Sequence, residues 1–147
     1  MNSSLADREV YERGFPTDPA AAARRFAFEG DSREWLGCTT AREIARLLEQ
    51  IHNAEVASRA SSDEMLAILQ QQFYDSRLPQ RIAFRAKIAH KTGDWSPIAG
   101  HDVGIIFSAS GPIVVALFVS QNRGDFFEVE ATHGRIAEAL LDIWGEL

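Results

Sequence analysis

Three stretches decide the fold of this chain: A-K-I-A-H-K-T-G at residues 86–93, D-V-G-I-I at 102–106 and G-P-I-V-V at 111–115. The first alternates as a strand does, so residues 86, 88 and 90 face one side and residues 87, 89 and 91 the other. Residues 103–107 and 113–119, which overlap the other two stretches, are continuously apolar, as expected of strands whose two faces are both covered. Short connections, one of them the tight turn Ser110-Gly111-Pro112, favour antiparallel pairing.

Helix signals lie on both sides of these strands. Thr40 and Glu43 have capping-box spacing ahead of an apolar stripe, which predicts a helix over about 40–54. Ser61 with Glu64 predicts a shorter helix over about 62–72. A third helix, over about 127–145, is predicted by a stripe that should pack on the sheet, consisting of Val129, Ile136, Ala137, Leu140, Leu141 and Trp144.

We therefore predict an α+β fold, an antiparallel β meander of about three strands packed with helices. The strands should span about 85–92, 102–108 and 112–121. Residues 1–37, punctuated by glycine and proline, are predicted to form an irregular arm.

Composition limits the possible functions. The 147 residues are 46% apolar, enough for one domain with a core, and the net charge is -6. Lys87 and Lys91 are the only lysines, and the arginines are dispersed, which argues against nucleic-acid binding. Cys38 is the single cysteine, so neither a disulfide nor a cysteine-based zinc site is expected. The N-terminus lacks an apolar signal region, and the longest apolar run, 113–119, is too short to span a membrane.

The triplet Lys91-Thr92-Gly93 carries the most suggestive chemistry. At the end of a strand, an ammonium and a hydroxyl presented on one side could hold a carboxylate. Gly93 lacks a β-carbon, so a substrate could lie against the strand edge. The backbone N–H of Asp94 could then point at a developing oxyanion. We predict a substrate-binding set of Lys91, Thr92, Gly93 and Asp94, without a metal or another cofactor.

In order and spacing, these motifs resemble the C-terminal half of the class A β-lactamase family and its penicillin-binding relatives. Upstream, Gly30-Asp31 and the stretch 39–45 resemble the entry to the helix that follows the family's Ω-loop. The resemblance covers residues 30–147. It implies that residues 38–147 form the C-terminal part of the family's domain and that the arm contains a remnant of the Ω-loop. In that remnant, Asp18 stands near the position of the family's glutamate.

The sequence departs from the family in its catalytic elements. The family's nucleophile motif is S-x-x-K, but Phe84 and Ile88 occupy the positions three residues before the two lysines. Neither Ser-Asp-Asn nor Tyr-x-Asn occurs. The simplest interpretation is a shortened form of the fold that cannot hydrolyse a lactam alone, since acylation needs an activated serine.

The resemblance leaves several functions open. The chain could be the C-terminal portion of a β-lactamase-like serine hydrolase, a peptidoglycan peptidase-like fragment, or a binding or structural module that retains the fold without catalysis. The implied ligand is a β-lactam or a peptidoglycan-like small molecule. Family members are commonly periplasmic or secreted, and the compartment of this chain stays open.

Other residues receive less specific predictions. His90 should be packed rather than catalytic, and His52 and His133 should lie at the surface. His101 and Asp102 are adjacent, a poor arrangement for one metal ion. Trp95 could flank a substrate groove or cover the core. The strand at 113–119 should form an exposed apolar edge that invites self-association, unless the arm at 1–37 folds back over it.

Overall fold

The computed structural model describes residues 39–145, which form a sheet and its flanking helices. The predicted arm at residues 1–37, including Asp18 and Gly30-Asp31, lies outside the described residues. In chain order the elements are α3 (Ala41–His52), α4 (Arg59–Leu69), the 3-10 helix η2 (Leu78–Arg81), β1 (Lys87–Trp95), β2 (Ala99–Ser108), β3 (Gly111–Leu117) and α5 (Phe126–Trp144).

The sheet is an antiparallel meander with β2 in the centre. Its strand order is β1-β2-β3. His90 lies opposite Gly104, and Gly104 lies opposite Val115, in an unbroken register. Gly111 has φ +129° at the β2–β3 turn, a conformation that favours glycine. The prediction of an α+β fold with about three antiparallel strands is confirmed.

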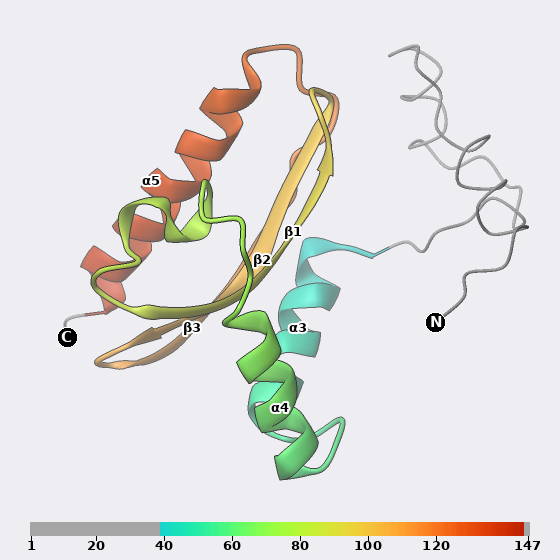
Figure 1. The fold of residues 1–147 in the computed structure, drawn as a ribbon, viewed down its shortest axis with the longest axis vertical. Coiled ribbons are helices and arrows are strands. Elements are labelled where there is room, and N and C mark those ends of the chain that lie inside the picture. The colour runs from blue at the N-terminus through green and yellow to red at the C-terminus, as the bar shows by residue number, and fades with distance from the viewer. Residues whose placement is uncertain (1–38, 146–147) are drawn as a thin grey trace, which may run out of the picture. The chain divides into compact units, whose positions relative to one another are not determined.

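Helices cover both faces of the sheet (Figure 1). On one face, α5 and η2 enclose a core that includes Leu78, Ile106 and Leu141. On the other face, α3 and α4 enclose a second core that includes Leu48 and Ile105. Because adjacent strand residues point to opposite faces, the continuous apolar run of β2 supplies both cores.

Helix α3 starts as its sequence predicts. The Thr40 hydroxyl accepts a hydrogen bond from the Glu43 N–H at 3.2 Å, and the Glu43 carboxylate accepts one from the Thr40 N–H at 2.8 Å. Donation from the Thr40 N–H, and then from the Thr40 hydroxyl at 3.1 Å, lowers the pKa of the Glu43 carboxyl. The helix ends at His52, two residues before the predicted end, because the chain turns through Asn53 to Ala54 at φ 58°.

The other boundaries also differ from those predicted. The N-cap of α4 is Ser58, whose hydroxyl accepts from the Ser61 N–H, so this helix starts three residues earlier and ends at Leu69. Strand β1 continues to Trp95 and β2 already begins at Ala99, where a longer loop was predicted. Backbone pairing between the two strands extends the ladder through glycines that resemble loop residues in the sequence. No helix among residues 39–145 is long and apolar enough to cross a membrane.

Candidate substrate-binding edge of the sheet

Strand β1 presents one row of main-chain groups outward from the sheet. The Gly100 N–H donates to the Val119 carbonyl at 3.2 Å, so the even-numbered residues of β2 bond toward β3. Its odd-numbered residues must then bond toward β1, where His101 lies opposite Gly93. It follows that the N–H and C=O groups of Thr92 and Asp94 point to the outer edge of β1, which no described strand covers.

The side chains of Lys91 and Thr92 lie on opposite faces of the sheet, so the prediction that they lie on one side is wrong. They alternate along a regular strand, so Lys91 is exposed on the α3–α4 face, whereas Thr92, 7% exposed, faces α5. The Lys91 ammonium donates to the outward carbonyl of Thr92 at 2.6 Å. The positive charge therefore lies beside the outer edge.

Gly93 has space around it. A β-carbon built on Gly93 would meet only the His101 ring, at an ordinary contact distance of 3.7 Å. Packing among the described residues therefore does not require glycine here. Burial lowers the pKa of His101, and the positive charge of Arg77 lowers it further. The Nδ1 of His101 accepts from the Val119 N–H at 3.2 Å, so this nitrogen carries no proton.

A buried hydrogen-bonded pair supports β1 from the α5 face. Asp102 is fully buried, and its two carboxylate oxygens lie 2.9 and 3.1 Å from Nδ1 of His90. The same carboxylate accepts from the Leu78 N–H at 3.0 Å. His90 is 3% exposed, which confirms that it is a packed residue. Gly104 makes room for it, since a β-carbon there would lie 2.6 Å from the β-carbon of His90.

Arg77 fixes the end of β1. Its guanidinium is 2% exposed and pairs with the Asp94 carboxylate. It also donates to the His101 carbonyl at 2.7 Å and lies 3.4 Å from the Glu130 carboxylate of α5. Its carbon Cζ is 5.6 Å from the centroid of the Phe126 ring. These contacts hold the backbone of Asp94, and with it the outward N–H, against α5.

His133 is buried, in contrast to the prediction that it lies at the surface. It is 2% exposed, and neither ring nitrogen has a hydrogen-bond partner in the described structure. Desolvation by burial lowers its pKa. The buried stripe of α5 runs through Val129, His133, Ala137 and Leu141, four residues apart, so His133 faces the sheet. His52, also predicted at the surface, is half-buried, with its ring centroid 5.9 Å from that of Phe107.

The structure also places His101, Asp102 and Trp95, whose predicted roles were less specific. His101 and Asp102 face opposite sides of β2, and no group of three His, Cys, Asp or Glu residues in 39–145 could hold a metal ion. Trp95 is half-buried. Sequence reasoning missed Arg77 and the pairing of His90 with Asp102. The alternation of the strands could have predicted the His90–Asp102 pair, because His90, Thr92 and Asp102 lie on the same face of the sheet.

The fold resembles that of solved β-lactamases and of PBP-A. TLA-3 extended-spectrum β-lactamase is 24% identical, with a TM-score of 0.67, over 78% of this chain and 44% of its own. A β-lactamase from Chitinophaga pinensis is 22% identical, with a TM-score of 0.69, over 92% and 53% respectively. PBP-A, solved as an acyl-enzyme complex with penicillin G, is 24% identical, with a TM-score of 0.62, over 84% and 52%.

The chain thus spans roughly half the length of these solved structures. No curated protein sequence matches it. A sequence profile described as the Beta-lactamase enzyme family matches residues 7–144, nearly all of the chain. With the meander and its flanking helices, this match establishes that the chain belongs to the β-lactamase enzyme family.

Proposed function

We propose that this chain supplies the substrate-binding wall of a β-lactamase-like serine hydrolase and binds ligands of the β-lactam class. The observation that carries the proposal is the outer edge of β1. There the Lys91 ammonium lies beside main-chain groups of Thr92 and Asp94 with which no strand of the described residues pairs.

The chemistry of this edge suits an acylating amide that bears a carboxylate. Lys91 would exchange its bond to the Thr92 carbonyl for a charge-assisted bond to the ligand's carboxylate. The Asp94 N–H would then donate to the carbonyl oxygen on which negative charge develops. Arg77 holds Asp94 through its side chain, so this donor would need little reorganisation when the ligand binds.

We propose that the chain does not hydrolyse β-lactams by itself. Its sequence contains neither S-x-x-K nor Ser-Asp-Asn, and without an activated serine no acyl-enzyme can form. Purified chain mixed with nitrocefin should show only the buffer rate, and intact mass should show no penicilloyl adduct. Turnover well above that rate would overturn this part of the proposal.

Binding can be tested without turnover. Titration of the labelled chain with benzylpenicillin should shift the amide resonances of residues 91–94, and Lys91→Ala should weaken affinity about tenfold, as expected for one charge-assisted bond. Lys87→Ala is a matched control, because Lys87 is the other lysine and is exposed on the same face of β1. Equal effects of the two substitutions would refute a specific role for Lys91.

A substitution at Gly93 can test ligand binding without changing the stability of the fold. Gly93→Ala adds a methyl group in ordinary contact with His101, so it should leave the urea midpoint nearly unchanged. The same methyl group would stand where a ligand must approach the strand, and benzylpenicillin affinity should fall. A variant that binds as tightly as the parent would show that ligands do not lie against this strand.

A binding module without catalysis is the second candidate function. It is favoured because the sequence lacks the nucleophile motif while the β1 edge remains held by buried contacts. The resemblance to PBP-A extends the candidate ligands to peptidoglycan-type amides, as a proposal for a peptidase-like fragment. Competition of an acyl-D-alanyl-D-alanine peptide with benzylpenicillin would support peptidoglycan-type amides as ligands. A chain that binds benzylpenicillin but not the peptide would contradict that proposal.

A further inference from the structure

His101 of β2 lies beside the candidate binding edge, and two contacts fix the orientation of its ring. His101 and Gly93 are opposite each other in the β1–β2 register, so they share the α3–α4 face of the sheet. Toward β3, the ring atom Nδ1 accepts from the Val119 N–H at 3.2 Å. Toward β1, the ring atom Cδ2 would lie 3.7 Å from a β-carbon built on Gly93. The side of the ring formed by Cδ2 and Nε2 therefore faces β1.

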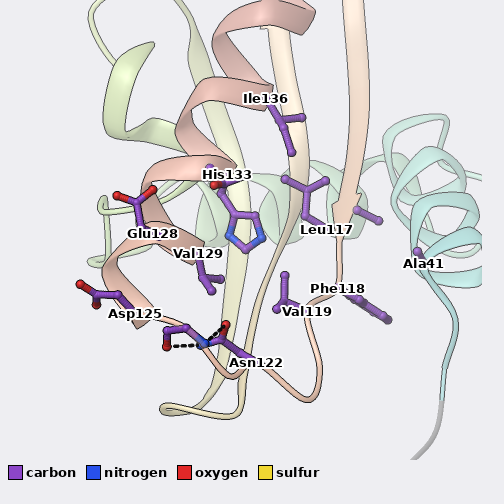
Figure 2. Close-up of a pocket in the computed structure, with 13 residues that line it drawn as sticks. Ala41, Leu117, Phe118, Val119, Asn122, Asp125, Glu128, Val129, His133 and Ile136 are labelled. Atoms are coloured by element: carbon purple, nitrogen blue, oxygen red, sulfur yellow. Dashed lines mark hydrogen bonds between the residues drawn. The ribbon is translucent and has the colours of Figure 1, made fainter.

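The contact with Val119 also determines the tautomer of His101. Because Nδ1 accepts a hydrogen bond, the proton of the neutral imidazole is on Nε2. His101 is half-buried, and in the described part of the chain its Nε2–H has no acceptor. The Phe118 ring packs against the imidazole with the ring centroids 5.0 Å apart, and it points to the α3 side of β3, away from His133 (Figure 2). These contacts hold a hydrogen-bond donor beside Gly93.

The backbone of His101 is held as well. Its carbonyl accepts from the buried Arg77 guanidinium at 2.7 Å, and the same guanidinium pairs with the Asp94 carboxylate. One side chain thus links His101 to the end of β1 that carries the Asp94 N–H. A donor fixed in this way needs little reorganisation when a ligand binds.

Donors of different kinds therefore lie around Gly93. The Lys91 ammonium lies at the Thr92 carbonyl. The Asp94 N–H lies at the outer edge of β1, and the imidazole donor of His101 lies one strand further in. The proposed function uses the first two, for a carboxylate and for the reacting carbonyl. The imidazole donor is neutral, so it suits a neutral carbonyl, whereas the ammonium suits the carboxylate.

We propose that His101 determines specificity at this edge by donating from Nε2 to a second carbonyl group of the ligand, that of an acylamino side chain. This role rests on the proposed function, since it concerns the same site and the β-lactam class. Benzylpenicillin carries a carboxylate, a lactam carbonyl and an acylamino carbonyl, one acceptor for each donor. Aminopenicillanic acid has the same ring system with a free amine instead of the acylamino group. It would leave the imidazole N–H unpaired, so the site should discriminate against it.

Asparagine and glutamine at position 101 separate the roles of the two ring nitrogens. In His101→Asn, the amide oxygen replaces Nδ1 as the acceptor for the Val119 N–H, but no donor reaches the position of Nε2. In His101→Gln, the amide nitrogen reaches that position and keeps the donor. We expect His101→Asn to weaken benzylpenicillin binding about fivefold and to leave aminopenicillanic acid unaffected, whereas His101→Gln should stay within about twofold of the parent.

A matched control and a direct measurement complete the test. His52→Asn replaces a half-buried histidine of α3 whose ring packs on Phe107, and it should change neither affinity. Imidazole nitrogen resonances of the labelled full chain should show the Nε2–H tautomer of His101 without ligand. The Nε2 resonance should shift with benzylpenicillin but not with aminopenicillanic acid.

Two outcomes would overturn the role of His101 and leave the proposed function intact. One is a shift of residues 91–94 with benzylpenicillin but no shift of the His101 Nε2, and the other is an equal loss of affinity for both ligands in His101→Asn. A His101→Gln variant that folds like the parent but binds as weakly as His101→Asn would also overturn it. Failure of the proposed function looks different, because residues 91–94 would then not shift with benzylpenicillin, and the role of His101 would fall with it.

Discussion

Replacing Asp102 with alanine should destabilise the fold more than any surface carboxylate can. The Asp102 carboxylate is fully buried and is shared by Nδ1 of His90 and the Leu78 N–H. Its removal leaves two buried donors without an acceptor, each at a cost of about 1–3 kcal/mol. Together these two losses predict a fall of about 4 kcal/mol in the free energy of unfolding.

Urea unfolding followed by far-ultraviolet circular dichroism measures this loss as a lower midpoint at unchanged slope. Asp125→Ala is the control, since Asp125 is exposed and accepts one bond from the Phe127 N–H at 3.0 Å. Loss of that helix cap should cost about 1 kcal/mol. If Asp102→Ala costs no more than Asp125→Ala, the buried pair does not stabilise β1 as argued. A double-mutant cycle with His90→Ala would then show no coupling.

Three further predictions follow from single residues. His133→Leu should raise the free energy of unfolding by about 1 kcal/mol at neutral pH, since a buried imidazole without hydrogen bonds is lost. The pKa of His133 is lowered in the folded chain, so below about pH 6.5 the unfolded chain binds a proton that the folded chain does not, and the free energy of unfolding falls. Urea denaturation at a series of pH values should therefore show a smaller fall for the leucine variant than for the parent. Arg77→Met should lower the free energy of unfolding by about 3 kcal/mol, because the partly buried carboxylate of Glu130 loses a cation; a melting temperature equal to that of the parent would contradict this. Thr40→Ala should cost about 1 kcal/mol by loss of the α3 cap, and helix content by circular dichroism should fall with it.

Periodicity in the sequence predicts the elements of this fold well but not the contacts between them. The alternation at 86–91 and the capping box at Thr40 are local features, and both reappear in the structure. Strand ends were misplaced because Gly93 and Gly100 resemble loop residues, whereas each pairs in the β1–β2 ladder. The ladder is formed by main-chain groups, and the periodicity of the side chains does not predict how far their pairing extends.

The buried polar residues were the least predictable part of the site. His133 has the spacing of the α5 stripe, but its polarity suggested the surface. Trp144, assigned to the same stripe by its apolar character, is 51% exposed. Arg77 precedes β1 by ten residues and reaches Asp94 only after η2 has turned the chain. Pairings of this kind follow from the tertiary arrangement, which periodicity does not contain.

The polar contacts beneath β1 are better explained by positioning than by stability. A buried polar pair is seldom more stabilising than apolar residues of similar volume, yet His90 and Asp102 lie under the strand whose outer edge carries the candidate binding groups. We infer that the pair fixes the position of β1. The double variant His90→Leu with Asp102→Asn keeps an acceptor for the Leu78 N–H but removes the bond between the two side chains. The new amide N–H groups would have no acceptor beside the leucine, so the unfolding free energy should fall by about 1–3 kcal/mol, and benzylpenicillin should bind at least severalfold more weakly. Unchanged affinity in the folded double variant would show that the pair serves packing alone.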